Sequence, residues 1–237
     1  MEKVVYTLWA APSEDPEAFA SALLGPVARE VVAAGVRGLQ VNVADGSVAD
    51  ATVRIASGEP ISALVSVWLD SVAAPERTAV EDVLGAAAAR IAGYLVTESV
   101  PLAPPAGQPG ARDEGFAQIS LLRRPSSLDR ENWLENWQGR HTAVAIETQS
   151  TFGYVQNAVV RAVTPDAPPT DAIVEELFPT AALSDPYAFY DVAAGDKPAL
   201  RQRVHAMLDS VATFGGQEGI DVVPTSRYVT LSPFARS

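Results

Sequence analysis

The chain has 237 residues, 48% of them hydrophobic and 19% charged, and a formal net charge of −12. This length suits one large domain or two small ones, and the composition is typical of a packed globular protein. The acidic charge disfavours nucleic-acid partners because it repels their phosphates, and the sequence has no apolar run of about 18 residues to span a membrane.

Cysteine is absent from the sequence, which excludes disulfides, thiol catalysis and thiolate metal ligands. The chain has two histidines, His141 and His205, and no motif such as His-Glu-x-x-His. We therefore expect no metal site and no cofactor bound through one. The amino-terminal segment is typical of a strand rather than of a signal peptide, so we expect a cytoplasmic protein.

The first half of the chain predicts the element order βαββαβ. Asp15 and Pro16 are typical of the N-cap and the first position of a helix. The expected elements are a strand at 4–10, a helix at 16–35, strands at 36–45 and 61–70, a helix at 75–95 and a strand at 96–102.

A linker follows, because the segment LAPPAGQPGARDEG has no apolar period and is rich in proline and glycine. We expect a first domain at 1–101, a linker at 102–114 and a second domain at 115–237.

The second half repeats the order of the first. Ser126 and Asp129 form a capping-box pattern that opens a helix. The segment AIVEELF is ambiguous by its period, but its match to ALVSVWL in the first half favours a strand. The expected elements are strands at 115–125, 151–163, 172–178 and 220–231, a helix from 126 to about 149, and a helical region at 183–214 broken near Gly195.

This repeat predicts an α+β fold. A βαββαβ unit forms a four-stranded antiparallel sheet with two helices on one face, the ferredoxin-like arrangement. The bare sheet faces must be covered, so two tandem ferredoxin-like domains are expected to pack their sheets together as an α+β barrel within one chain. We also expect a homodimer, since free strand edges remain.

A stripe of large side chains runs along the helix of the second half. Trp133, Trp137 and His141 are spaced by four residues and share one helix face. Their counterparts in the first half are Phe19, Leu23 and Val27, a plain apolar stripe. His141 is therefore either a core histidine bound to a backbone carbonyl or an acid/base in a pocket that only the second half contains. The two tryptophans are either core residues or walls of that pocket.

The next strand supplies candidate partners for His141. Alternation places Tyr154 and Gln156 on one face and Asn157 on the other. Tyr154 falls on Leu39 of the first half, whereas Asn157 falls on Asn42, which favours a structural role for Asn157. We interpret His141 and Tyr154 as candidate catalytic residues, and Trp133, Trp137, Gln156 and Asn157 as candidate substrate-binding residues.

Other polar residues carry weaker signals. Adjacent Glu175 and Glu176 point to opposite sides of a strand and form no carboxylate dyad. Arg123 and Arg124 are expected at the solvent rim, and His205 on a helix surface or a dimer contact.

The segment ISLLRRPSSLDRENWLENWQGRHTAVA, followed by YVQNAVV, resembles the EthD family of the dimeric α+β barrel superfamily. The resemblance rests on a strand, Arg-Arg-Pro, a helix with Trp-x-x-x-His and a strand with Tyr-x-Gln-Asn. It covers residues 115–237 and is faint over 1–110. It implies ferredoxin-like domains and a small-molecule pocket between helix and sheet. The superfamily includes cofactor-independent monooxygenases, cyclases, isomerases and decarboxylases, and EthD proteins are linked to ether degradation.

Three functions stay open at this point. The first is a cofactor-independent enzyme that performs proton transfer, or cofactorless oxygenation, on a small apolar carbonyl or phenolic metabolite. The second is a non-catalytic protein that binds a hydrophobic ligand or supports an enzyme. The third is haem binding, since chlorite dismutase-like proteins are tandem chains of similar length in which histidine ligates iron.

Overall fold

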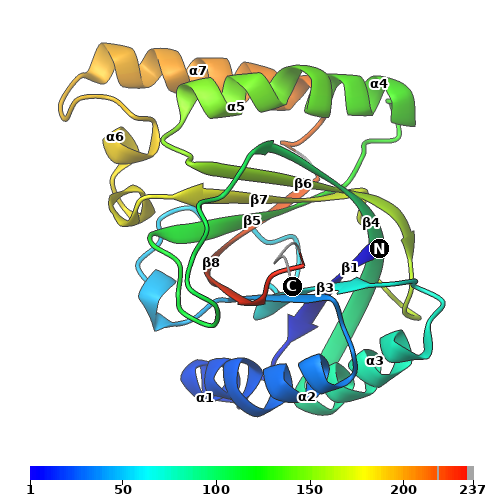
Figure 1. Ribbon diagram of the computed structural model, residues 1–237. Helices are drawn as coiled ribbons and strands as arrows, with labels where there is room; N and C mark the ends of the chain where they lie inside the picture. The colour runs from blue at the N-terminus through cyan, green and yellow to red at the C-terminus, as the bar shows by residue number, and fades with distance from the viewer. Residues whose placement is uncertain (218, 234–237) are drawn as a thin grey trace.

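The computed structural model describes residues 1–217 and 219–233. Its centre is a closed antiparallel barrel of eight strands in the order β1-β3-β2-β8-β5-β7-β6-β4 (Figure 1). The strands are β1 (Glu2–Trp9), β2 (Gly38–Val43), β3 (Ala63–Leu69), β4 (Arg90–Leu102), β5 (Phe116–Leu122), β6 (Gly153–Ala162), β7 (Ala172–Phe178) and β8 (Ile220–Leu231).

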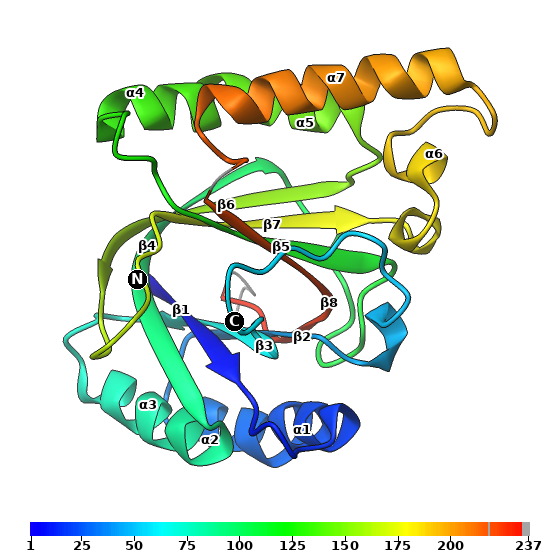
Figure 2. The same cartoon turned by 180° about the vertical axis from the view of Figure 1, so that it is seen from behind.

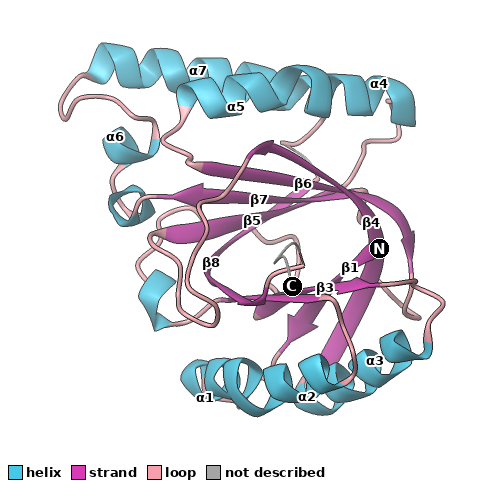
Figure 3. Cartoon of the chain, viewed as in Figure 1, coloured by secondary structure: helices cyan, strands magenta, loops and turns pink. Residues whose placement is uncertain are grey.

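The helices lie outside the barrel in two layers on opposite sides (Figures 2 and 3). One layer holds α1 (Pro16–Ala22), α2 (Ala28–Ala33) and α3 (Pro75–Ala87), and the other holds α4 (Arg130–Leu134), α5 (Thr142–Thr148) and α7 (Lys197–Thr213), with the short α6 (Pro186–Phe189) beside it. None of the helices in the described ranges is long and apolar enough to cross a bilayer.

Each half of the chain contributes four neighbouring strands. The order is β4-β1-β3-β2 in the first half and β8-β5-β7-β6 in the second, and β2–β8 and β4–β6 pairs join the two sets. The structure therefore confirms an α+β fold with an antiparallel barrel. These joins also pair the outer strands of both sets, so the free edges on which we based the homodimer are absent among the described strands. The homodimer itself stays a prediction.

The helix predicted at 75–95 is too long. α3 ends at Ala87, Ala88 is extended, and β4 begins at Arg90. Ile91, Tyr94 and Val96 are β-branched or aromatic and pair with β1. The alanine-rich run before these residues favoured a helix in the sequence, so the predicted helix continued too far. Pairing with β1 decides where the strand begins.

Both halves open their first helix with the same cap. Asp15 accepts a hydrogen bond from the Ala18 amide at 2.9 Å, and Asp129 from the Asn132 amide at 2.8 Å. Each helix is then interrupted by a π-helical segment, η1 (Leu23–Val27) or η3 (Glu135–His141), before it continues. The second-half helix begins at Arg130 with Asp129 as its N-cap, so the capping box predicted from Ser126 is wrong. The sequence also did not predict these wider turns, which are frequent at functional sites.

The linker was predicted at 102–114, and residues 103–115 contain neither helix nor strand apart from a bridge between Arg112 and Tyr228. Gly115 ends this segment at φ +75°, and an added Cβ would lie 1.9 Å from the Phe178 carbonyl oxygen. Gly110 has nearly the same φ, +74°, but open space around it.

These two glycines form a matched pair that tests whether the backbone at the start of β5 requires glycine. Gly110→Ala should lower the free energy of unfolding by about 1–2 kcal/mol, the cost of a left-handed residue. Gly115→Ala should cost about 3 kcal/mol or more, because a backbone clash adds to the same strain. Urea unfolding of both variants measures the difference, and equal losses would contradict this view of the junction.

Candidate functional site

A cavity of about 220 Å³ lies between the second-half strands and their helices. Strands β5 to β8 form its floor, and η3 and α7 form its roof. Most of the lining is apolar, with Leu122, Val174, Met207 and Phe214 among it. Polar side chains enter from the floor and the roof, so the cavity is an apolar chamber with a few directed polar groups, as small-molecule sites usually are.

Three polar side chains form a row across the floor. Gln118 on β5, Glu176 on β7 and Tyr154 on β6 are direct cross-strand partners, and all three line the cavity. The same register positions in the first half hold Val4, Val67 and Leu39, each fully buried. The fold therefore accepts an apolar row here, and the second half carries a polar one instead.

Glu176 is the group in this row whose pKa is shifted towards neutral pH. Burial raises the pKa of its carboxyl to about 7, although a hydrogen bond with Gln118 opposes the shift. No ion pair with Glu176 occurs among the described residues. A carboxyl with this pKa exchanges a proton near neutral pH, which is the property required of a general acid or base.

His141 ends η3 and borders the cavity from the roof. Its Nδ1 lies 3.0 Å from the Ser210 hydroxyl on α7, and its ring packs 4.8 Å from Phe214. Burial lowers its pKa to about 4, so the ring is neutral at neutral pH. The partner is a side chain rather than the backbone carbonyl expected for a core histidine.

The two tryptophans have different places. Trp137 lines the cavity, and its indole N–H has no hydrogen-bond partner among the described residues. Trp133 lies behind it at 5.1 Å, does not line the cavity, and donates to the Phe214 carbonyl at 3.1 Å. The structure thus places Trp137 in the candidate site and Trp133 in the core that supports it.

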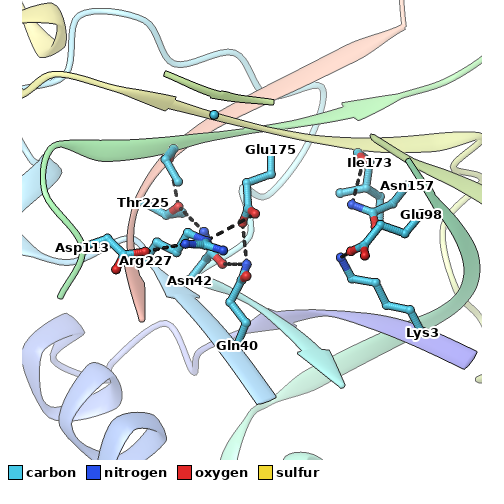
Figure 4. A network of polar contacts seen from close by, with 12 residues as sticks. Lys3, Gln40, Asn42, Glu98, Asp113, Asn157, Ile173, Glu175, Thr225 and Arg227 are labelled. Carbon is cyan, nitrogen blue, oxygen red and sulfur yellow. Dashed lines mark hydrogen bonds and ion pairs between the residues drawn. The ribbon is translucent and has the colours of Figure 1, made fainter. Parts of the chain in front are cut away.

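The candidates on β6 divide as alternation requires. Tyr154 lines the cavity, and burial followed by the Glu176 charge raises the pKa of its phenol well above its ordinary value. Gln156 is on the same face and donates to the Thr142 hydroxyl at 2.5 Å, joining the sheet to α5. Asn157 points into the barrel and donates to the Ile173 carbonyl at 3.2 Å (Figure 4). The sheet therefore separates Asn157 from His141, so it cannot share a site with it.

Sequence reasoning passed over Glu176. Glu175 and Glu176 do face opposite sides, since Glu175 lies inside the barrel and Glu176 lines the cavity. The available signal was the match of AIVEELF to ALVSVWL, which sets Glu176 on Val67. A carboxyl at a position that is apolar in the other half indicates a functional site as clearly as His141 does, whose counterpart in the first half is Val27. Of the other polar residues, Arg123 pairs with Asp221 at 2.8 Å, and His205 is exposed on α7.

The first half fills its equivalent space with side chains. Phe19 and Leu23 are buried as predicted, and the ring of Tyr6 stands at the register position of Ser120. The first half nevertheless contributes to the second-half cavity, because Thr52 and Val53 from the β2–β3 loop line it. The Thr52 amide donates to the Leu183 carbonyl at 2.9 Å, which fixes this loop over the opening.

The cavity beside His141 is too small for haem. The cavity of about 220 Å³ is smaller than the roughly 300–1,000 Å³ of pockets that hold drug-sized ligands, and a porphyrin is larger still.

No protein-family model and no curated protein matches the chain. Among solved structures, an anthrone oxidase-like protein aligns over 100% of this chain and 96% of its own, with a TM-score of 0.56 and 13% identity. A protein of Lactobacillus acidophilus described as a putative monooxygenase aligns over 97% of this chain and 96% of its own, with a TM-score of 0.50 and 10% identity. These similarities show a shared α+β barrel fold over the whole chain.

Replacement of Glu176 by glutamine tests its environment. A carboxyl whose pKa rises from 4.5 to about 7 on folding contributes stability below pH 4.5 that is lost as pH rises through 7. Glutamine mimics the protonated form, so Glu176→Gln should match the wild type near pH 4. Above pH 8 it should be more stable by about 3 kcal/mol. Urea unfolding at both pH values measures this, and a destabilised variant at pH 8 would contradict a buried carboxyl with a raised pKa.

Proposed function

We propose that this protein is a small-molecule enzyme of the α+β barrel type that performs proton transfer, without a cofactor, on an apolar carbonyl or phenolic metabolite. The observation that carries the proposal is a buried, unpaired carboxyl, Glu176, in the same apolar cavity as a neutral histidine, His141. Perturbed titratable groups in an enclosed cavity are typical of catalytic sites. We also propose that the chain is an EthD-type protein, which is supported by the presence of Trp137, His141 and Tyr154 of the resembling motif in this one cavity.

Glu176 is the better base of the two. Its carboxylate is present near neutral pH. Proton uptake by this carboxylate is favourable, since burial stabilises the neutral form relative to the charged one. The same burial makes an imidazolium at His141 unfavourable, so His141 acts as a hydrogen-bond donor rather than as the base. If the Ser210 hydroxyl donates to Nδ1, the ring proton is on Nε2 and is available to a ligand.

The reaction follows from these roles. The Glu176 carboxylate takes a proton from the carbon next to the substrate carbonyl, and the C–H electron pair moves into the C–C bond as the carbonyl oxygen becomes an enolate. His141 and the un-ionised phenol of Tyr154 donate hydrogen bonds to that oxygen. Protonated Glu176 then returns the proton to the same or another carbon, which gives exchange or isomerisation.

The similarity to an anthrone oxidase-like protein and to a protein described as a monooxygenase supports an oxygenation variant. An enolate that transfers two electrons to O₂ forms a C–O bond, and protonated Glu176 can supply the proton that completes a hydroperoxide. The alternative of a non-catalytic binding protein needs Trp137 and the apolar walls but no titrating group.

Deuterium exchange separates these functions. Anthrone and smaller enolisable ketones, with ketones that have no α-hydrogen such as anthraquinone and benzophenone as non-enolisable controls, are incubated in D₂O with the protein, and exchange above the buffer rate is measured by mass spectrometry. We expect Glu176→Gln to lose about 10²–10⁴-fold and His141→Val about 10²-fold, with ligand binding retained. His205→Ala, exposed on α7, is the matched control and should keep full activity. Binding without exchange would favour the non-catalytic protein, and full activity in both site variants would rule out this mechanism.

The pH dependence of kcat/KM is a second test. Because the carboxylate is the active form, the rate should rise about tenfold per pH unit below pH 7 and level off above it. A rate that instead falls from pH 5 to pH 8 would assign catalysis to a protonated acid.

A further inference from the structure

The interior of the barrel has two chemically different ends. One end is packed with apolar side chains from both halves, including Val5, Leu64, Ile119 and Ile173. At the other end the inward positions are charged or polar, and buried (Figure 4). Alternation requires only that these side chains point inward, so the apolar end shows that the barrel could have been filled without charge.

The charged end holds two separate ion-paired groups. Lys3 pairs with Glu98 on one side of the interior. Arg227 on the other side pairs with Asp113 and lies with its Nε 3.4 Å from Glu175. Gln40 donates to Glu175 at 2.6 Å. The two groups face each other across the interior in Figure 4.

A second cavity, of about 350 Å³, lies between these groups. Lys3, Glu98, Glu175 and Arg227 all line it, so its polar lining has two positive and two negative charges. Lys3, Glu175 and Arg227 are each nine-tenths buried or more, and the Arg227 Nε has no hydrogen-bond partner among the described residues.

The remaining walls are largely apolar. The Trp68 ring lies under the Lys3 ammonium at 4.7 Å and lines the cavity with Val155 and Val229. Prolines of the segment 103–109 form the wall opposite the barrel. Proline loses little conformational entropy when it becomes ordered, so ordering this wall against a ligand costs little free energy.

We propose that this second cavity binds a small zwitterion, an amino acid with an apolar side chain. Buried ion pairs contribute little to stability compared with apolar packing, so stability alone does not explain four charges around an open space. With Asp113, which pairs with Arg227, the two groups hold three carboxylates and two cations, so a ligand that carries only a carboxylate is disfavoured, and one that carries only an ammonium offers Lys3 and Arg227 no new partner. A zwitterion places its carboxylate near Lys3 or Arg227 and its ammonium near Glu98 or Glu175, while its side chain packs on Trp68 and the prolines.

Calorimetric titration of the full chain with L-phenylalanine and L-leucine tests this. We expect saturable binding of at least one of them, with 2-phenylethylamine and 3-phenylpropanoate binding at least about tenfold more weakly than L-phenylalanine, because each has lost one charge-assisted contact. Glu175→Gln should weaken binding by about tenfold or more while Gln40 and Asp113 keep their partners. His141→Val, in the other cavity, is the matched control and should bind as the wild type does.

A second variant distinguishes loss of binding from loss of the folded structure. Lys3→Gln/Glu98→Gln removes the opposite pair without leaving an unpaired charge, and it should also weaken binding by about tenfold if its circular dichroism is unchanged. No binding of either amino acid at about 10 mM would overturn the proposal. Equal binding of the singly charged analogues, or loss of binding in His141→Val alone, would overturn it as well. Because the readout is binding in a different cavity, its failure leaves the enzymatic proposal intact.

Discussion

The constraint on which the rest of the structure depends is closure of the eight-stranded barrel. Once every strand is paired on both sides, each strand presents one row of side chains to a helical layer and the alternate row to the interior. A single step along β7 therefore moves from Glu175, bound to Gln40 inside the barrel, to Glu176 in the cavity beneath η3. Two adjacent residues of the same type serve two chemical environments because the sheet lies between them.

The two halves form an internal control for what the fold itself requires. The first half solves the packing between sheet and helices with Val4, Val67 and Leu39, and with the ring of Tyr6 in the remaining space. The second half uses Gln118, Glu176 and Tyr154 at the same register positions and leaves a cavity. Burial of an unpaired carboxyl costs free energy, so this substitution is a departure from the stable solution already present in the chain. Such departures are expected where a protein binds or reacts.

The first half nevertheless contributes residues to the second-half cavity. Its β2–β3 loop reaches the opening of the second-half cavity through Thr52 and Val53, and Ile55 forms a bridge with Val222 of β8. The cavity thus draws its floor and roof from one half and part of its rim from the other. The π-helical turn in η3 adds to this arrangement, since it ends at His141, where the ring meets Ser210 of α7.

The sequence by itself determined the order of the elements, the capped helix at Asp15, the division of strand residues between two alternating faces, and the stripe that brings Trp137 and His141 to one surface. These features follow from local periodicity and from the comparison of two copies. Only the tertiary structure decided where α3 ends, that both strand edges close, that Asn157 lies inside the barrel, and that Glu176 lies in the cavity below His141. Such outcomes depend on pairing between residues far apart in the chain, and a side chain's burial and pKa are set by those partners rather than by its neighbours in sequence.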